Sequence, residues 1–154
     1  MDMLQPTDAH RKLEKLAGNW TGCEVLSPSP FDPTGGDATG TVHNRVALNG
    51  FVLVQDYEQQ RDGKVSLTGH AVFTHDAGQD RYTLHWFDSS GFPPSQFHGN
   101  FEGDVLSMIC DMPMGKLRAT FDVSKEGTYV FKMEMSGDGQ NWNPFMDGTY
   151  TQAS

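Results

Sequence analysis

The chain has 154 residues, a length typical of one domain. It carries 11 Lys and Arg against 20 Asp and Glu, for a net charge of −9, so its field repels nucleic acid and anionic membranes. We therefore expect neither as a partner. The opening residues MDMLQPTDAHRK lack the basic start and apolar middle of a signal peptide, which makes the cytoplasm the expected location.

One short helix is predicted near the start of the chain, within residues 6–17. Thr7 and Asp8 are candidate N-caps, and Gly18 falls where a helix end favours a residue with positive φ. Between them, apolar residues recur at helical spacing, at Ala9, Leu13, Leu16 and Ala17. We expect this helix to lay its apolar stripe on the rest of the domain.

From Gly18 onward the apolar period changes to two, and turn sequences such as Asn49-Gly50 separate the alternating segments. The predicted strands are 19–27, 39–48, 51–60, 64–74, 81–88, 95–102, 104–111, 116–124, 128–135 and 143–151. No second helix is long enough for a parallel crossover, so the fold class is all-β and antiparallel. An open sheet of about ten strands would expose long edges, which favours an up-and-down β-barrel over 18–151 within a single domain, 1–154. A two-sheet sandwich is the alternative.

The more hydrophobic face of each strand is predicted to point inward, and it is rich in aromatic residues and Met. Barrels of this size commonly hold one small ligand, and such a lining suits a hydrophobic or aromatic molecule. The predicted ligand-binding residues are Phe73, Tyr82, Trp86, Phe97, Phe101, Phe121, Tyr129, Phe131 and Met133. The Tyr82 and Tyr129 hydroxyls are expected to orient the ligand. Alternatively, these side chains fill the barrel, and the protein works through its outer face or as a dimer. The sequence is compatible with a monomer and with a homodimer.

Residues that could perform chemistry form no known motif. His43, His70, His85 and His98 fall on the more polar faces of predicted strands, without the spacing of a metal site. Nucleophile-elbow, phosphate-loop and dinucleotide motifs are absent from the sequence. We predict no catalytic residue, metal or cofactor. Two alternatives stay open: an enzyme with His85 or His98 as acid or base inside the barrel, and a haem or metal carrier.

The Gly18-Asn19-Trp20 triplet after a short helix resembles the G-x-W signature at the first strand of lipocalins and other calycins, whose Trp plugs the closed end of the barrel. The wider pattern is similar to the mostly bacterial family of domain of unknown function 1579. The matching parts are Leu16–Trp20, "YTLHWFDSSG" at 82–91 and "NWNPFMDGTY" at 141–150. The resemblance implies a calycin-like barrel and supplies no established ligand, activity or catalytic residue.

Haem-binding calycins of the nitrobindin type also begin with a G-x-W-x-G stretch, as Gly18 to Gly22 does. They ligate iron through a His near the C-terminal end, whereas this sequence has no His after His98. From the resemblance we expect Trp20 to point inward and seal the barrel under the helix, and Gly22 to leave space for its ring.

Overall fold

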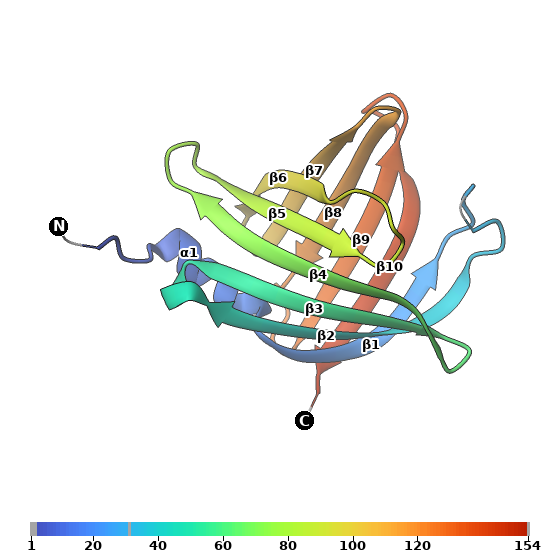
Figure 1. Cartoon of the computed structure of the whole chain (residues 1–154), viewed down its shortest axis with the longest axis horizontal. Helices are drawn as coiled ribbons and strands as arrows, with labels where there is room; N and C mark the ends of the chain where they lie inside the picture. The colour runs from blue at the N-terminus through green and yellow to red at the C-terminus, as the bar shows by residue number, and fades with distance from the viewer. Residues whose placement is uncertain (1–2, 31, 154) are drawn as a thin grey trace.

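The alternating segments form ten antiparallel strands in a computed structural model, which describes residues 3–30 and 32–153. The strands are β1 (Gly18–Leu26), β2 (Gly36–Ala47), β3 (Val52–Arg61), β4 (Lys64–Asp76), β5 (Arg81–Asp88), β6 (Ser95–Glu102), β7 (Val105–Met112), β8 (Gly115–Asp122), β9 (Thr128–Ser136) and β10 (Asn143–Gln152). Each pairs with the next, and β1 also pairs with β10, which closes the barrel (Figure 1). The predicted fold class is confirmed. Residues 1–2, 31 and 154 of the predicted domain lie outside the described residues.

The predicted helix is present in a shorter form. Helix α1 (Asp8–Lys12) continues as the 3₁₀ turn η1 (Leu13–Leu16) and lies at one end of the barrel (Figure 1). Thr7 is the N-cap, and its backbone N–H donates to Nδ1 of His10 at 3.0 Å, one half of a capping box. A second short turn, η2 (Leu48–Gly50), connects β2 and β3 where the sequence predicts a hairpin; Asn49 and Gly50 have positive φ there.

Trp20 lies beneath the helix, as expected. Its side chain is 2% exposed, and its indole N–H donates to the carbonyl of Leu16 at 2.9 Å. Its ring packs edge-on against Tyr129 with 5.1 Å between centroids. The space at Gly22, however, is taken by strand β10 rather than by Trp20: a Cβ at Gly22 would lie 1.9 Å from the carbonyl oxygen of Thr149. The expected role of Gly22 is therefore wrong, and a close approach of two strands explains the glycine.

The inward rows of the strands form the core, as the alternation predicts. Leu53, Phe73 and Leu106 are fully buried in it. Val65 is an exception at 55% exposure, because it lies near the start of β4, where the pairing of β3 and β4 shifts register between Gln59 and Gln60.

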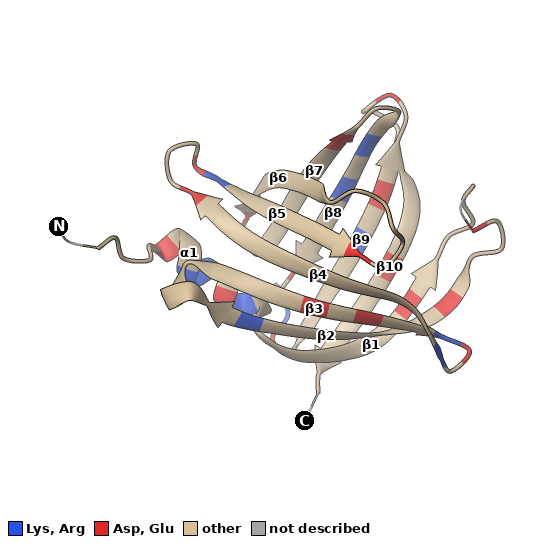
Figure 2. Ribbon diagram, in the orientation of Figure 1, with Lys and Arg blue, Asp and Glu red and all other residues tan. Residues whose placement is uncertain are grey.

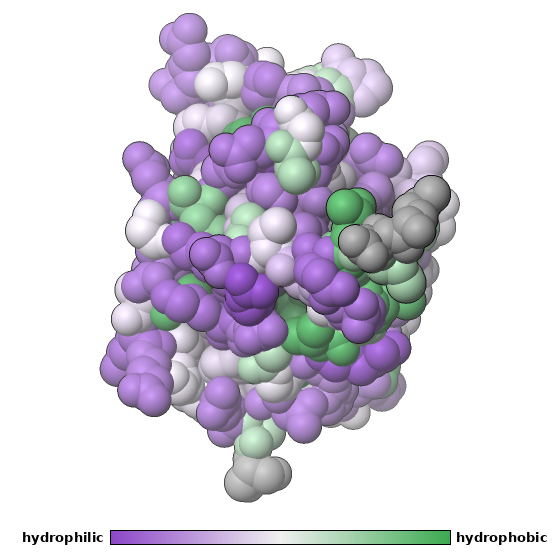
Figure 3. Space-filling model, turned by 90° about the vertical axis from the view of Figure 1, so that its left-hand side faces the viewer, coloured by the Kyte–Doolittle hydropathy of each residue, from purple (hydrophilic) through white to green (hydrophobic). Residues whose placement is uncertain are grey.

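The surface carries mixed charge. Basic residues are scattered between the helix, the hairpin turns and strands β8 and β9 (Figure 2). The helix end is mostly hydrophilic, with a hydrophobic area beside the N-terminal segment (Figure 3). Exposed hydrophobic residues near that segment include Met3, Leu4 and Leu48. Within 3–30 and 32–153, no helix has the length and apolar character needed to span a bilayer.

Candidate functional site

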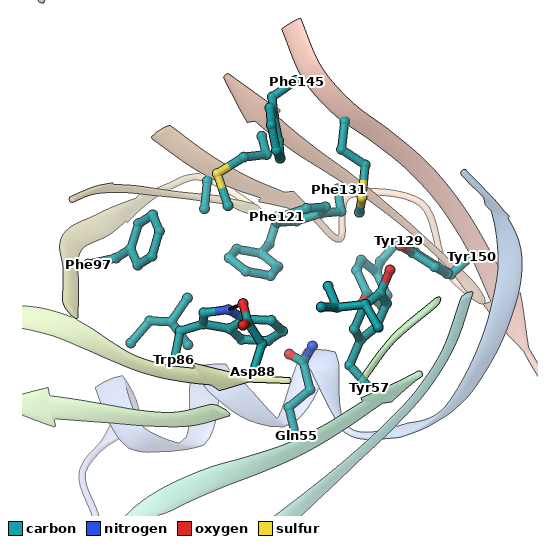
Figure 4. Close-up of a pocket in the computed structure, with 15 residues that line it drawn as sticks. Gln55, Tyr57, Trp86, Asp88, Phe97, Phe121, Tyr129, Phe131, Phe145 and Tyr150 are labelled. Atoms are coloured by element: carbon teal, nitrogen blue, oxygen red, sulfur yellow. Dashed lines mark hydrogen bonds between the residues drawn. The ribbon is translucent and has the colours of Figure 1, made fainter. Parts of the chain in front are cut away.

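A cavity of about 150 Å³ lies inside the barrel, between mid-strand and the end away from helix α1 (Figure 4). Its wall is mainly aromatic and aliphatic, and Asp88, Phe145 and Met146 of the wall are partly exposed at the open end. The lining residues are Gln55, Tyr57, Leu67, Leu84, Trp86, Asp88, Phe97, Ala119, Phe121, Tyr129, Phe131, Met133, Phe145, Met146 and Tyr150. A mostly apolar wall with a few polar groups is typical of small-molecule sites.

Most of the residues predicted to bind a ligand do line this cavity, namely Trp86, Phe97, Phe121, Tyr129, Phe131 and Met133. Strands β5, β6, β8 and β9 supply them, which brings together side chains up to 47 positions apart in the sequence. That these six residues bind a ligand remains a prediction.

Phe73, Tyr82 and Phe101 face inward but lie outside the cavity, so their predicted place in its wall is wrong. Phe73 is fully buried and packs against Phe121 with 5.4 Å between ring centroids. The Tyr82 hydroxyl donates to the carbonyl of Ala9 at 2.6 Å, and its ring packs against Phe101. Tyr82 and Phe101 therefore support the helix at the closed end.

One wall of the cavity depends on Gly69. The register of β3, β4 and β5 places Tyr57, Gly69 and Asp88 in one row across the sheet. The Trp86 ring lies over the gap, since a Cβ at Gly69 would approach its Cη2 atom to 2.2 Å. Trp86 also donates its indole N–H to Asp88 at 2.7 Å, so the missing side chain at Gly69 allows Trp86 and Asp88 to form one unit of the wall.

A buried carboxylate lies directly behind the wall. Glu24, on β1, is 1% exposed and accepts hydrogen bonds from the hydroxyls of Tyr57, at 2.7 Å to Oε2, and Tyr150. The Gln59 side chain donates to Oε1 of Glu24 at 3.1 Å and in turn accepts from the Ser66 hydroxyl at 2.9 Å. These contacts satisfy the carboxylate, and no basic side chain among the described residues pairs with it.

Glu24 is not among the predicted site residues, although its position in the sequence carries a signal. Glu24 follows Trp20 by four residues on one strand and therefore shares its inward face. Its paired neighbours are the small residues Ala38 on β2 and Gly148 on β10. A Cβ at Gly40 would lie 2.3 Å from Oε2 of Glu24, so small residues on both sides make room for the carboxylate and for Tyr150.

The tyrosines around Glu24 are held in their protonated form. Burial, and then the charge of Glu24, raise the pKa values of Tyr57, Tyr129 and Tyr150 well above the ordinary value of 10. Tyr57 and Tyr150 thus remain donors to Glu24 at physiological pH.

Two polar groups of the wall have no hydrogen-bond partner among the described residues. The Gln55 side chain is only 7% exposed, and its amide points into the cavity (Figure 4). The Tyr129 side chain is 2% exposed, and its hydroxyl likewise makes no hydrogen bond within 3–30 and 32–153. Buried polar groups are nearly always paired, so both are available to a bound molecule or to water.

The histidines lie away from the cavity. His85 and His98 fall on the outward rows of β5 and β6, where Nδ1 of His98 lies 3.0 Å from the Thr83 hydroxyl. Burial, and then electrostatic interaction with Arg81 and with His85, lower the pKa of His98. The alternative of His85 or His98 as acid or base inside the barrel is therefore wrong. In the part of the chain that the structure describes, no three His, Cys, Asp or Glu residues gather as a metal site.

With this geometry established, comparisons with known proteins assign the family. The family model described as "Protein of unknown function (DUF1579)" matches residues 5–152. The chain belongs to the DUF1579 family. No curated protein matches it in sequence.

Two solved structures share the fold of this DUF1579 barrel. The crystal structure of Rv2717c from M. tuberculosis aligns with a TM-score of 0.74 at 14% identity, over 96% of this chain and 99% of the other. The S-type phycobiliprotein lyase CPES from Guillardia theta aligns with a TM-score of 0.63 at 7% identity, over 97% of this chain and 99% of the other. At these identities the likeness shows the calycin-like barrel.

Proposed function

We propose that this DUF1579 barrel binds a small, largely apolar molecule in its cavity. The observation that carries the proposal is the Gln55 amide, which is buried, unpartnered within the described chain and surrounded by aromatic residues. Polar groups that line a mostly apolar cavity commonly fix the orientation of a bound molecule. A ligand with one complementary polar group would bond to Gln55 and also cover the rings of Trp86, Phe121 and Phe131.

The size of the cavity limits the buried part of the ligand. An apolar cavity of about 150 Å³ in another protein binds benzene. The cavity here has the same volume, about 150 Å³, so it accommodates one ring, and a larger ligand extends through the open end past Phe145 and Met146. Flat rings fit best, because aromatic side chains form most of the wall.

The test is a screen of ring compounds by native mass spectrometry and by tryptophan fluorescence, in which Trp86 is the reporter at the cavity. We expect saturable binding to the wild-type protein. Ala119→Leu, which adds three carbon atoms at a fully buried wall position, should abolish it. Thr120→Leu is the matched control, because Thr120 is the next residue of β8 and faces outward. No binding by the wild-type protein, or equal binding by Ala119→Leu, would contradict the proposal.

A further inference from the structure

The charge of the cavity wall indicates which polar group a ligand carries. Among the described residues, the wall contains the carboxylate of Asp88 and no Lys, Arg or His. The buried carboxylate of Glu24 lies one hydrogen bond behind Tyr57 and Tyr150. The cavity is therefore negative, and nothing in its wall neutralises a negative ligand.

Asp88 is held as a carboxylate. Partial burial raises its pKa, but hydrogen bonds from the backbone and hydroxyl of Ser90 and from the Trp86 indole outweigh burial and lower the pKa below its ordinary value. These donors approach from the turn after β5 and from Trp86, and the carboxylate still lines the cavity.

The Tyr57 and Tyr150 hydroxyls add acceptors rather than donors, whereas the Tyr129 hydroxyl can donate or accept. Tyr57 and Tyr150 donate hydroxyl hydrogen bonds to Glu24, so they can offer only oxygen lone pairs to the cavity. One lone pair of Tyr57 already accepts from the Gln59 amide at 3.2 Å. The Gln55 amide supplies a carbonyl oxygen as well, and Figure 4 shows Gln55 and Asp88 turned toward the same region of the cavity. The Asp88 carboxylate and the Gln55 carbonyl oxygen are two acceptors in the region where a ligand's polar group would lie.

The aromatic residues favour the same kind of ligand. Tyr57 and Trp86 lie 6.1 Å apart between ring centroids and both border the cavity next to Asp88. The faces of such rings attract cations through their quadrupoles. A positive group near Asp88 would thus meet a carboxylate, neutral acceptors and aromatic faces together.

We infer that the cavity selects a lipophilic amine, a ring compound whose protonated nitrogen lies between Asp88 and Gln55, and that it discriminates against carboxylates. The inference rests on the proposed function and goes beyond it in naming the ligand's chemical class. The protonated nitrogen donates to the Asp88 carboxylate and to the Gln55 carbonyl, while the ring of the ligand occupies the apolar part of the cavity.

The experiment compares three probes with similar apolar parts: phenethylamine, propylbenzene and 3-phenylpropionate. We expect phenethylamine to bind about tenfold more tightly than propylbenzene, because hydrogen bonds between charged groups are about twice as strong as neutral ones. We expect 3-phenylpropionate to bind most weakly. Isothermal titration calorimetry at neutral pH measures all three, and the preference for the amine should disappear when the pH exceeds the pKa of the amine.

The variant Asp88→Asn keeps an oxygen that can accept from the Trp86 indole and should remove most of the preference for the amine over propylbenzene. Asp56→Asn is the matched control, because Asp56 is an exposed, outward-facing acid on β3. If propylbenzene binds and the amine shows no advantage, or 3-phenylpropionate binds most tightly, the inference is overturned and the proposed function stands. If none of the probes binds, both are overturned.

Discussion

The two halves of the barrel differ in how completely their interiors are filled. At the helix end, Leu13, Leu16 and Trp20 pack against one another, and the carbonyl of Leu16 accepts from both Trp20 and the Asn44 amide, the latter at 2.8 Å. In the open half, rings of similar size surround a cavity of about 150 Å³. One continuous set of strands therefore carries a closely packed half and a half that encloses a cavity.

The largest expected effect on stability concerns the filled half. Trp20→Ala removes a buried indole and its hydrogen bond, and truncations of this kind cost about 3–5 kcal/mol. Urea denaturation measures the loss in the free energy of unfolding. Trp142→Ala is the control: Trp142 is partly exposed and contacts Arg118 through a cation–π interaction, so we expect a loss of about 1 kcal/mol or less. Equal losses in the two variants would show that burial of Trp20 at the helix end contributes no more to stability than the partly exposed Trp142.

The next effect concerns Glu24, which lies behind the cavity wall and bonds to Tyr57 and Tyr150. Glu24→Leu leaves the Tyr57 and Tyr150 hydroxyls buried without their acceptor, so we expect a loss of about 3 kcal/mol. Glu24→Gln keeps one acceptor oxygen and should cost about half as much. Glu58→Gln, on the outward face of β3, is the control and should change the unfolding free energy little. A Glu24→Leu protein as stable as the wild type would mean that the carboxylate contributes nothing to the fold.

The variant Gly69→Ala should close the cavity and reduce stability by a smaller amount. The added methyl group overlaps the Trp86 ring and pushes it into the cavity; overpacking of this kind costs about 1–3 kcal/mol. We therefore expect ring compounds to bind much more weakly while the protein stays folded. Gly137→Ala is the control, because a Cβ at Gly137 would meet no atom of the described residues within 4 Å. Unchanged ligand binding in Gly69→Ala would show that Trp86 does not shape the site.

The smallest effect is a dependence of stability on pH at the helix end. Burial, and then the charges of His75 and Arg11, lower the pKa of His10 below its ordinary value of 6.5. Below pH 6.5 the unfolded chain therefore binds more protons at this position than the folded one, and the free energy of unfolding falls as the pH falls through the lowered pKa. Protonation also ends the hydrogen bond that Nδ1 accepts from the Thr7 N–H.

The measurement is urea denaturation between pH 7.5 and about 5, a range in which histidines titrate. His10→Gln should reduce the slope of the unfolding free energy against pH. His43→Gln should leave the slope unchanged, because His43 is exposed on the outside of β2. A steeper slope in His10→Gln than in the wild type would reverse the assigned sign.

Alternation along the sequence predicts the barrel and the face of each strand, because side chains of a strand point alternately to the two sides. It does not predict depth along the barrel axis. Phe73, Tyr82 and Phe101 share the inward face with Trp86, but three-dimensional register places them outside the cavity. Depth depends on strand stagger and on where the helix crosses the end, and neither follows from periodicity.

Polar residues that face inward are the second part of the site that hydropathy fails to indicate. Gln55 and Glu24 have polar side chains of types that usually lie on the surface, yet they are 7% and 1% exposed. Glu24 is buried only because Tyr57 and Tyr150, from strands far away in the sequence, supply hydrogen bonds. The burial of Glu24 can therefore be recognised only when the three-dimensional positions of Tyr57 and Tyr150 are known.

The pairing of β1 with β10 has a consequence for folding kinetics. Partners such as Gly22 and Tyr150 are 128 positions apart in the sequence. The pairing of β1 with β10 therefore closes a loop that contains almost the whole chain. Domains dominated by such distant contacts fold slowly, over roughly milliseconds to seconds. During synthesis, the edge of β1 stays without this neighbour until β10 leaves the ribosome, and a nascent chain that lacks β10 presents an open strand edge for aggregation.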